Sequence, residues 1–429
     1  MSVRLAGELR TTLSNVGWKA VSMPLDKVCR FLLIWACAPA LGTAAFGRFR
    51  YAATISVMLG LVMDLGLTIW TVRELARSRA RAATIARTVL GLRAMLMLPY
   101  LASVVVAALA VEGETRAAMV MLGLAGLAGA FIDHAAAVFR GSDRFDDDTR
   151  VNTARSLLVL GAGLAAIAAR PSVVNLTGGL LAGTLGAGVY CLWLVRRRAV
   201  GHGAYDPALA RAAARSGLPI CLAGVVSMLY FKADVLILKP VAGDAALGLY
   251  SAAYQIFEGS QLVPAIVLAA AFPSLARAHL DRERQRHWER LLAAALLALG
   301  LVVGGACYAA RAPIIGLVFR AGFADATPVL GILALGIPLM YLNYGLTHFL
   351  IARDLGHRNM IISTLLLVVN VSINVVAIPR FAGVGAAWAT VVTEAALTVC
   401  CLVGLAPRRS YSEEREPLAV SPSVSQKSP

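Results

Sequence analysis

Long hydrophobic runs alternate with short polar segments along almost the whole chain of 429 residues. A helix that crosses a bilayer needs about twenty mostly apolar residues, and the chain offers twelve such runs. The pattern therefore predicts an all-α polytopic membrane protein with about twelve transmembrane helices. The expected spans are 19–41, 52–72, 89–111, 117–139, 152–169 and 173–195, then 217–238, 249–271, 291–310, 326–352, 359–378 and 383–405.

Part of the first half recurs in the second half. Phe46, Gly47, Phe49, Ala52 and Ile55 align with Leu247, Gly248, Tyr250, Ala253 and Ile256, and the string Leu-Ala-Arg at 75–77 aligns with 275–277. A repeat of this length in an apolar chain is typical of transporters built from two related lobes. We therefore expect two six-helix lobes, at 1–201 and 202–407, and a disordered cytoplasmic tail at 408–429 that is rich in Ser, Pro and Glu.

The repeat also supports the first span, which hydropathy alone would leave doubtful. Asp26, Lys27 and Arg30 interrupt this span, and its counterpart in the second half is interrupted by Lys232 and Asp234. Ions at membrane depth are costly unless they meet water or a partner. Both helices are therefore expected to face an aqueous cavity.

Composition and charge narrow the class of protein. Hydrophobic residues make up 59% of the chain and charged residues only 15%, which excludes an ordinary soluble domain. The net charge of +16 comes from short arginine clusters between apolar runs, so it indicates membrane topology rather than nucleic-acid binding. Most Lys and Arg residues fall on one side if both termini are cytoplasmic. The seven cysteines lie in or beside apolar runs and are expected to be small core residues.

The sequence contains no enzyme signature. It has no phosphate-binding Gly-rich loop with Lys-Ser/Thr, and its six histidines show no metal-ligand spacing. We expect neither catalysis nor a cofactor nor a bound metal.

Cations inside the first-half spans are candidates for binding an anionic substrate. Lys27, Arg30 and Arg93 could contact a diphosphate, and Asp26 and Arg30 could equally form an ion pair along one helix. Arg93 and Asp133 lie at matching depth and could pair between helices, although Arg93 could instead reach the membrane surface.

In the second half, Lys232 is the candidate contact for an anionic head group. Tyr344 and His348 follow helical spacing and could stack on sugar rings, with an ordinary packed face as the alternative.

Four carboxylates inside spans are candidates for ion or proton coupling: Asp64, Asp133, Glu258 and Glu394. The repeat makes Asp64 and Glu258 counterparts. A neighbouring cation could simply neutralise Asp64, and Arg30 is the partner suggested by depth.

Ordered strings along nearly the whole chain resemble the polysaccharide transporter family. These are the Wzx-type flippases of the multidrug/oligosaccharidyl-lipid/polysaccharide exporter (MOP) superfamily. The strings are LGTAAFGRFRYA at 41–52, MDLGL at 63–67, RELAR at 73–77, FRG at 139–141, ADVLIL at 233–238, GLYSAAY at 248–254, FPSLAR at 272–277, NVVAIPRF at 374–381 and GVGAA at 383–387.

The resemblance implies six plus six helices around a central cavity that opens alternately to each side of a bacterial inner membrane. The implied cargo is an oligosaccharide linked to a polyprenyl diphosphate, and the implied partners are membrane lipids, a polysaccharide polymerase and glycosyltransferases, not nucleic acid. Lipid II flippases typically have fourteen helices, so the expected twelve argue against that branch. Two alternatives remain: a cation-coupled multidrug exporter with the same fold, and a non-transporting partner of a polymerase.

Overall fold

The computed structural model describes residues 24–198, 203–278, 282–353 and 355–406, with the side chains of 272–278 and 282 left out. Every regular element in these ranges is a helix, which confirms the predicted all-α fold. The start of the first predicted span, the predicted lobe boundary after residue 201 and the tail at 408–429 lie outside the described residues.

The helices follow the predicted spans but extend beyond their apolar parts. They comprise residues 24–41, α2 (Thr43–Asp64), α3 (Leu67–Arg77), η1 (Arg79–Arg81), α4 (Ala82–Leu109), α5 (Gly113–Gly141), α6 (Phe145–Ala169), α7 (Val173–Arg197), α8 (Pro207–Ser260), α9 (Leu262–Ala278), α10 (Arg282–Ala309), α11 (Arg311–Phe319), η2 (Ala321–Ala326), α12 (Thr327–Ala352) and α13 (Gly356–Leu405).

Nine helices in the described ranges are long and apolar enough to cross a membrane. Two of them, α8 and α13, contain 54 and 50 residues, or about 80 and 75 Å of helix, whereas a bilayer core is about 30 Å thick. Both bend at a residue with non-helical backbone angles, Gly243 in α8 and Ala382 in α13. Each can therefore cross the membrane twice. The number of twelve spans stays a prediction.

The bend in α8 shows that the internal repeat extends further than the aligned strings. Pro240 and Gly243 stand 201 positions after Pro39 and Gly42, and both glycines have positive φ, of 85° and 77°. Proline removes a helical hydrogen bond and glycine accepts the left-handed backbone, so each pair turns the chain between two helices. The first span and the first part of α8 thus each end in the same kind of turn.

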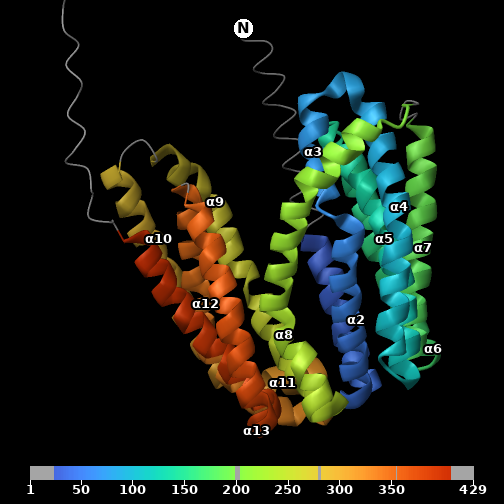
Figure 1. Ribbon diagram of the computed structural model, residues 1–429. Helices are drawn as coiled ribbons and strands as arrows, with labels where there is room; N and C mark the ends of the chain where they lie inside the picture. Colours follow the sequence, from blue (N-terminus) through green and yellow to red (C-terminus); the bar gives the residue numbers. More distant parts are fainter. Residues whose placement is uncertain (1–23, 199–202, 279–281, 354, 407–429) are drawn as a thin grey trace, which may run out of the picture.

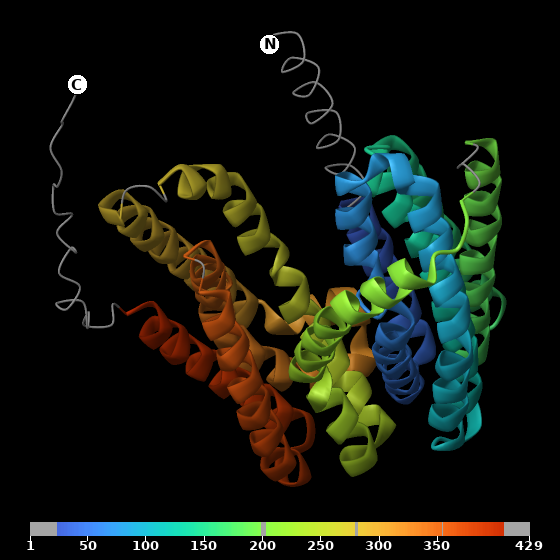
Figure 2. The same cartoon turned by 45° about the horizontal axis from the view of Figure 1, so that its top comes forward.

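The helices form two groups that meet at one end of the molecule and separate toward the other (Figure 1). Residues 24–41 and α2 to α7 form the first group, and α9 to α13 form the second. The two parts of α8 lie between them, and Figure 2 shows the same separation from a second direction. We call the end with Gly42 and Gly243 the converging end, and the end with α3 and the start of α8 the diverging end.

Glycine brings α2 and α8 into backbone contact at the converging end. A Cβ atom at Gly47 would lie 1.9 Å from the Asp244 carbonyl oxygen, and one at Gly248 would lie 1.9 Å from the Thr43 carbonyl oxygen. Both distances are far inside van der Waals contact, so α2 and α8 can cross this closely only because neither residue has a side chain. Figure 1 shows this crossing at the converging end.

Charged and aromatic contacts surround this crossing. Arg48 lies 3.5 Å from Glu114 and 3.9 Å from Asp244, and Lys239 lies 3.3 Å from Asp244. The ring of Phe46 contacts those of Phe319 and Phe323, at centroid distances of 6.4 and 5.9 Å. The converging end is therefore closed by contacts between both groups.

At the diverging end, the start of α8 packs on the first group. A Cβ atom at Gly217 would lie 2.2 Å from the Leu65 carbonyl oxygen, and Ala213 is buried with Leu67 and Trp70. Asp206 caps α8 by accepting hydrogen bonds from the backbone of Ala208 and Leu209, and it forms an ion pair of 3.0 Å with Arg81. The segment before α8 is thus held against α4 and against η1, the turn that precedes α4.

Asp206→Ala is expected to lower the melting temperature in detergent more than Asp206→Asn, because asparagine can still cap the helix. The hydrogen bond from Leu209, more than the Arg81 charge, holds the Asp206 pKa below its ordinary value. The stabilisation is therefore present above the ordinary aspartate pKa of about 4 and disappears as the pH falls through the lower folded pKa. Identical melting curves for both variants at neutral pH would contradict the capping role.

Candidate functional site

A cavity of ≈ 680 Å³ opens inside the first group of helices. It lies among residues 24–41 and α2 to α7, and we call it the first-lobe cavity. It is lined by several side chains that carry charge: Asp26, Arg30, Asp64, Arg93, Asp133, Arg140 and Arg155. Four cations and three anions in one cavity make it polar and slightly basic.

Arg93 is the most buried charge in the first-lobe cavity, with 1% of its side chain exposed. Its Nη1 donates to the Ala130 carbonyl at 3.0 Å, and its Nη2 donates to Asp64 and to the Thr68 hydroxyl at 2.9 Å each. One guanidinium therefore connects α4 to α2, α3 and α5. Neither Arg30 as the partner of Asp64 nor Asp133 as the partner of Arg93 is found.

The position of Asp64 follows from a break in the second predicted span. Leu65 and Gly66 adopt positive φ, of 44° and 70°, and end α2 at Asp64. The Asp64 carboxylate then accepts a hydrogen bond from the backbone N–H of Thr68 in the first turn of α3, at 3.3 Å, and from the Thr68 hydroxyl. A carboxylate at a helix start is favourable because free N–H groups point toward it. Asp64 thus stabilises the break as well as lining the cavity.

Asp133 forms its ion pair with Arg155 of α6 at 2.8 Å. The sequence prediction matched the depths of Asp133 and Arg93 but had no information on the direction each helix face takes. Arg155 was missed, although an arginine four positions into a predicted span was a usable signal. Arg140, which was also missed, pairs with the fully buried Asp148 at 3.0 Å.

The first described helix contributes two cations with different surroundings. Arg30 forms the expected ion pair with Asp26 at 2.9 Å, and Asp26 also accepts a hydrogen bond from Ser156. The Arg30 side chain stays 73% exposed. Lys27 is exposed and has no ionic partner within the described ranges. Arg30 lines the first-lobe cavity and can meet an incoming anion without breaking a buried pair, whereas Lys27 does not line this cavity.

Arg50 of α2 was assigned to an outer loop from the sequence, but it lies at the junction of the two groups. It interacts electrostatically with Glu258, Tyr254 and Asp234 of α8. Its Nε atom is buried without a hydrogen-bond partner, and no ion pair involves Arg50 within the described residues. The predicted span began at Ala52, so the prediction did not place Arg50 in a helix. Arg50 is thus a half-buried cation whose Nε donor is unused.

The second-half candidates have partners of their own. Lys232 lies 3.2 Å from Glu258 and 4.9 Å from the ring centroid of Tyr254. Tyr344 and His348 stack on each other, with ring centroids 4.8 Å apart, and the His348 Nδ1 lies 2.7 Å from the Tyr344 carbonyl oxygen. One face of each ring is therefore already covered by the other ring.

Glu394 of α13 differs from the other three candidate carboxylates. It is buried, and its carboxylate accepts a hydrogen bond from Asn343 at 2.7 Å, while Thr398 orients that amide. No cation pairs with Glu394 in the described part of the chain, whereas Asp64, Asp133 and Glu258 each have one.

The fold has solved counterparts among membrane transporters. A lipid II flippase, MurJ, in an inward closed conformation aligns with a TM-score of 0.68 and 13% identity over 90% of this chain and 87% of that chain. An inward-facing multidrug resistance MATE transporter of the MOP superfamily aligns with a TM-score of 0.69 and 14% identity over 91% of this chain and 97% of that chain. A MOP transporter from Pyrococcus furiosus aligns with a TM-score of 0.58 and 15% identity over 91% and 93%.

These likenesses show the MOP fold, and the solved neighbours are transporters and flippases rather than enzymes. A search of curated proteins found no significant match. Residues 12–279, more than half of the chain, match the family described as polysaccharide biosynthesis protein. The chain is therefore a multi-pass membrane protein with the MOP fold, and it belongs to the polysaccharide biosynthesis protein family.

Proposed function

We propose that the protein is a flippase that moves an oligosaccharide linked to a polyprenyl diphosphate across the bacterial inner membrane. The diverging end faces the cytoplasm in this proposal, because the arginine-rich segments and both termini belong to that side. The first-lobe cavity and Arg50 supply cations to the head group while the lipid tail stays in the bilayer.

The observation that carries the proposal is Arg50. A half-buried guanidinium that forms no ion pair is costly, so such a group is retained where it meets a charged ligand. Arg50 lies where the two groups join, and its donors can bind phosphate oxygens in a forked geometry. A multidrug exporter for amphipathic cations would place an acidic or apolar surface there instead.

Glu394 is the best candidate in this proposal for coupling transport to a proton or a small cation. A carboxylate in an apolar interior needs a positive charge or a proton, and the partners of Glu394 are neutral. The ion pairs of Asp64, Asp133 and Glu258 already satisfy this need. We also propose a polysaccharide polymerase and glycosyltransferases as partners. This part of the proposal rests only on the family match.

Arg50→Ala is expected to abolish flipping with normal amounts of protein in the membrane, and Arg50→Lys to retain part of it, because an ammonium keeps the charge but loses the forked contact. A strain that lacks the gene should accumulate lipid-linked oligosaccharide in the cytoplasmic leaflet, and wild-type protein should clear it. The matched control is Arg170→Ala, at an exposed loop position. Full clearance by a correctly inserted Arg50→Ala protein would overturn the role of Arg50, and a deletion strain without accumulation would overturn the flippase.

A further inference from the structure

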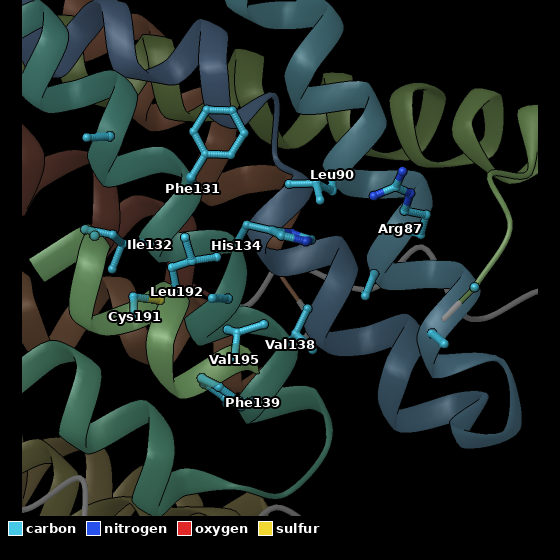
Figure 3. A pocket seen from close by; sticks show the side chains of 16 residues that line it. Arg87, Leu90, Phe131, Ile132, His134, Val138, Phe139, Cys191, Leu192 and Val195 are labelled. Atoms are coloured by element: carbon cyan, nitrogen blue, oxygen red, sulfur yellow. The ribbon is translucent and has the colours of Figure 1, made fainter. Parts of the chain in front are cut away.

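A second cavity, also of ≈ 680 Å³, lies on the face of α5 opposite the first-lobe cavity. It is a groove over α5, between α4 and α7, and it opens in the half of these helices near the diverging end. We call it the α4–α7 groove. Figure 3 shows its apolar walls, with Leu90 on α4, Phe131 and Val138 on α5, and Leu192 on α7.

Two polar side chains interrupt this apolar surface. Arg87 of α4 is exposed at the edge of the groove and has no ion-pair partner within the described ranges. His134 of α5 points toward α4, as Figure 3 shows. His134 is only 7% exposed, it hydrogen-bonds the backbone of Ala86, and its Nδ1 is buried without a partner.

These two residues lie at the same level, because the backbone partner of His134 is the neighbour of Arg87. An Nδ1 atom that is an acceptor in this tautomer needs a donor such as a hydroxyl group. The groove thus presents a cation and an unused acceptor beside an apolar trough.

A shallower hollow continues the groove across α7. It shares Leu192 with the groove and is lined also by Trp193, Arg196 and Arg197. Arg197 lies over the Trp193 ring at 4.1 Å, and Arg196 has no ionic partner within the described part of the chain. Arg87 therefore stands at one edge of the trough, and Arg196 and Arg197 line the neighbouring hollow on the α7 side.

We propose that the α4–α7 groove binds one anionic phospholipid of the leaflet that surrounds the diverging end. Its phosphate lies against Arg87 and Arg196, a head-group hydroxyl donates to His134, and one acyl chain fills the trough. The volume falls within the range of about 300–1,000 Å³ that is usual for ligand sites. The charge pattern selects an anionic over a zwitterionic head group. This lipid is a resident ligand and is separate from the cargo, because α5 stands between the groove and the first-lobe cavity.

The test is native mass spectrometry of the full-length protein in mild detergent, titrated with dioleoyl phosphatidylglycerol or dioleoyl phosphatidylcholine. We expect one phosphatidylglycerol to be retained more tightly than any phosphatidylcholine. Arg87→Gln and Arg196→Gln should each weaken this binding by about fivefold, the equivalent of about 1 kcal/mol for one basic residue at an anionic surface. Arg77→Gln, at an exposed arginine of α3 without an ionic partner in the described ranges, should leave it unchanged.

Gly188→Leu provides a second variant that does not depend on charge. Gly188 lines the groove, and no heavy atom lies within 4 Å of its Cβ position, so a leucine side chain can start there without a clash at Cβ and occupy the trough. We expect the tight site to disappear in Gly188→Leu and to persist in Gly161→Leu, which has the same open surroundings on α6. Three results would each overturn the proposal. They are unchanged binding in Gly188→Leu, equal retention of the two lipids, and a bound polyprenyl phosphate that phosphatidylglycerol cannot displace.

Discussion

Gly47→Ala is expected to force the converging end apart and to reduce flipping to background. The new methyl group would lie 1.9 Å from the Asp244 carbonyl oxygen, 2.8 Å from its carbon and 3.0 Å from the Gly248 nitrogen. All three are backbone atoms, so no side-chain rotation can relieve the overlap. The helices α2 and α8 must separate, and the contacts of Arg48 and Phe46 that close this end must loosen with them.

Spin labels at Glu112 and Ala324 would measure this change, in a protein whose seven native cysteines have been replaced. Both positions are exposed and lie next to the converging end, one before α5 and the other in η2. We expect the distance between the labels to increase in Gly47→Ala and in Gly248→Ala. Gly259→Ala, on the same helix α8 but with no heavy atom within 4 Å, should change neither the distance nor transport. Transport at the wild-type rate by a stable Gly47→Ala protein would show that the crossing need not be this close.

Arg93→Ala is expected to destabilise the protein as well as to stop flipping. The substitution leaves the Asp64 carboxylate, the Thr68 hydroxyl and the Ala130 carbonyl without their common donor. Breaking a buried pair costs about 3–5 kcal/mol, and the lower value applies here because Asp64 is 35% exposed. Thermal unfolding in detergent should show the loss, whereas Arg30→Ala should cost at most about 1 kcal/mol because that pair is exposed.

A double variant distinguishes the effect of this ion pair on stability from its effect on transport. Arg93→Met with Asp64→Asn removes both charges, so most of the stability should return. If flipping stays absent in the restored protein, the charges of this pair take part in transport. If flipping returns with stability, Arg93 is a structural residue only. A melting temperature of Arg93→Ala equal to that of the wild type would contradict the structural role itself.

Hydropathy was sufficient to predict the fold class, because the cost of burying polar groups in lipid determines where helices lie. The doubtful first span is helical over residues 24–41, and the repeat was the reason to expect it. The expected pair of Asp26 and Arg30 is present because residues four apart on a helix share a face. Local spacing thus predicts contacts within one helix.

Contacts between helices could not be predicted in the same way. A sequence gives the depth of a charge in the membrane but not the direction in which its helix face turns. For this reason Arg93 was matched with Asp133, whereas the structure pairs Arg93 with Asp64 and Asp133 with Arg155. The break at Leu65 and Gly66 was hidden inside an apolar run, and Arg50 appeared to precede the span that actually contains it.

The glycine crossing has the symmetry of a homodimer interface within one chain. Gly47 touches the carbonyl of Asp244, and Gly248 touches that of Thr43. Gly248 stands 201 positions after Gly47, and Asp244 stands 201 positions after Thr43. In such an isologous contact, one surface patch meets its own copy across a two-fold axis. A half-length chain could therefore build the whole crossing from a single glycine by pairing with itself. After duplication and fusion, the two positions are free to change separately, and the crossing can become asymmetric without losing its geometry.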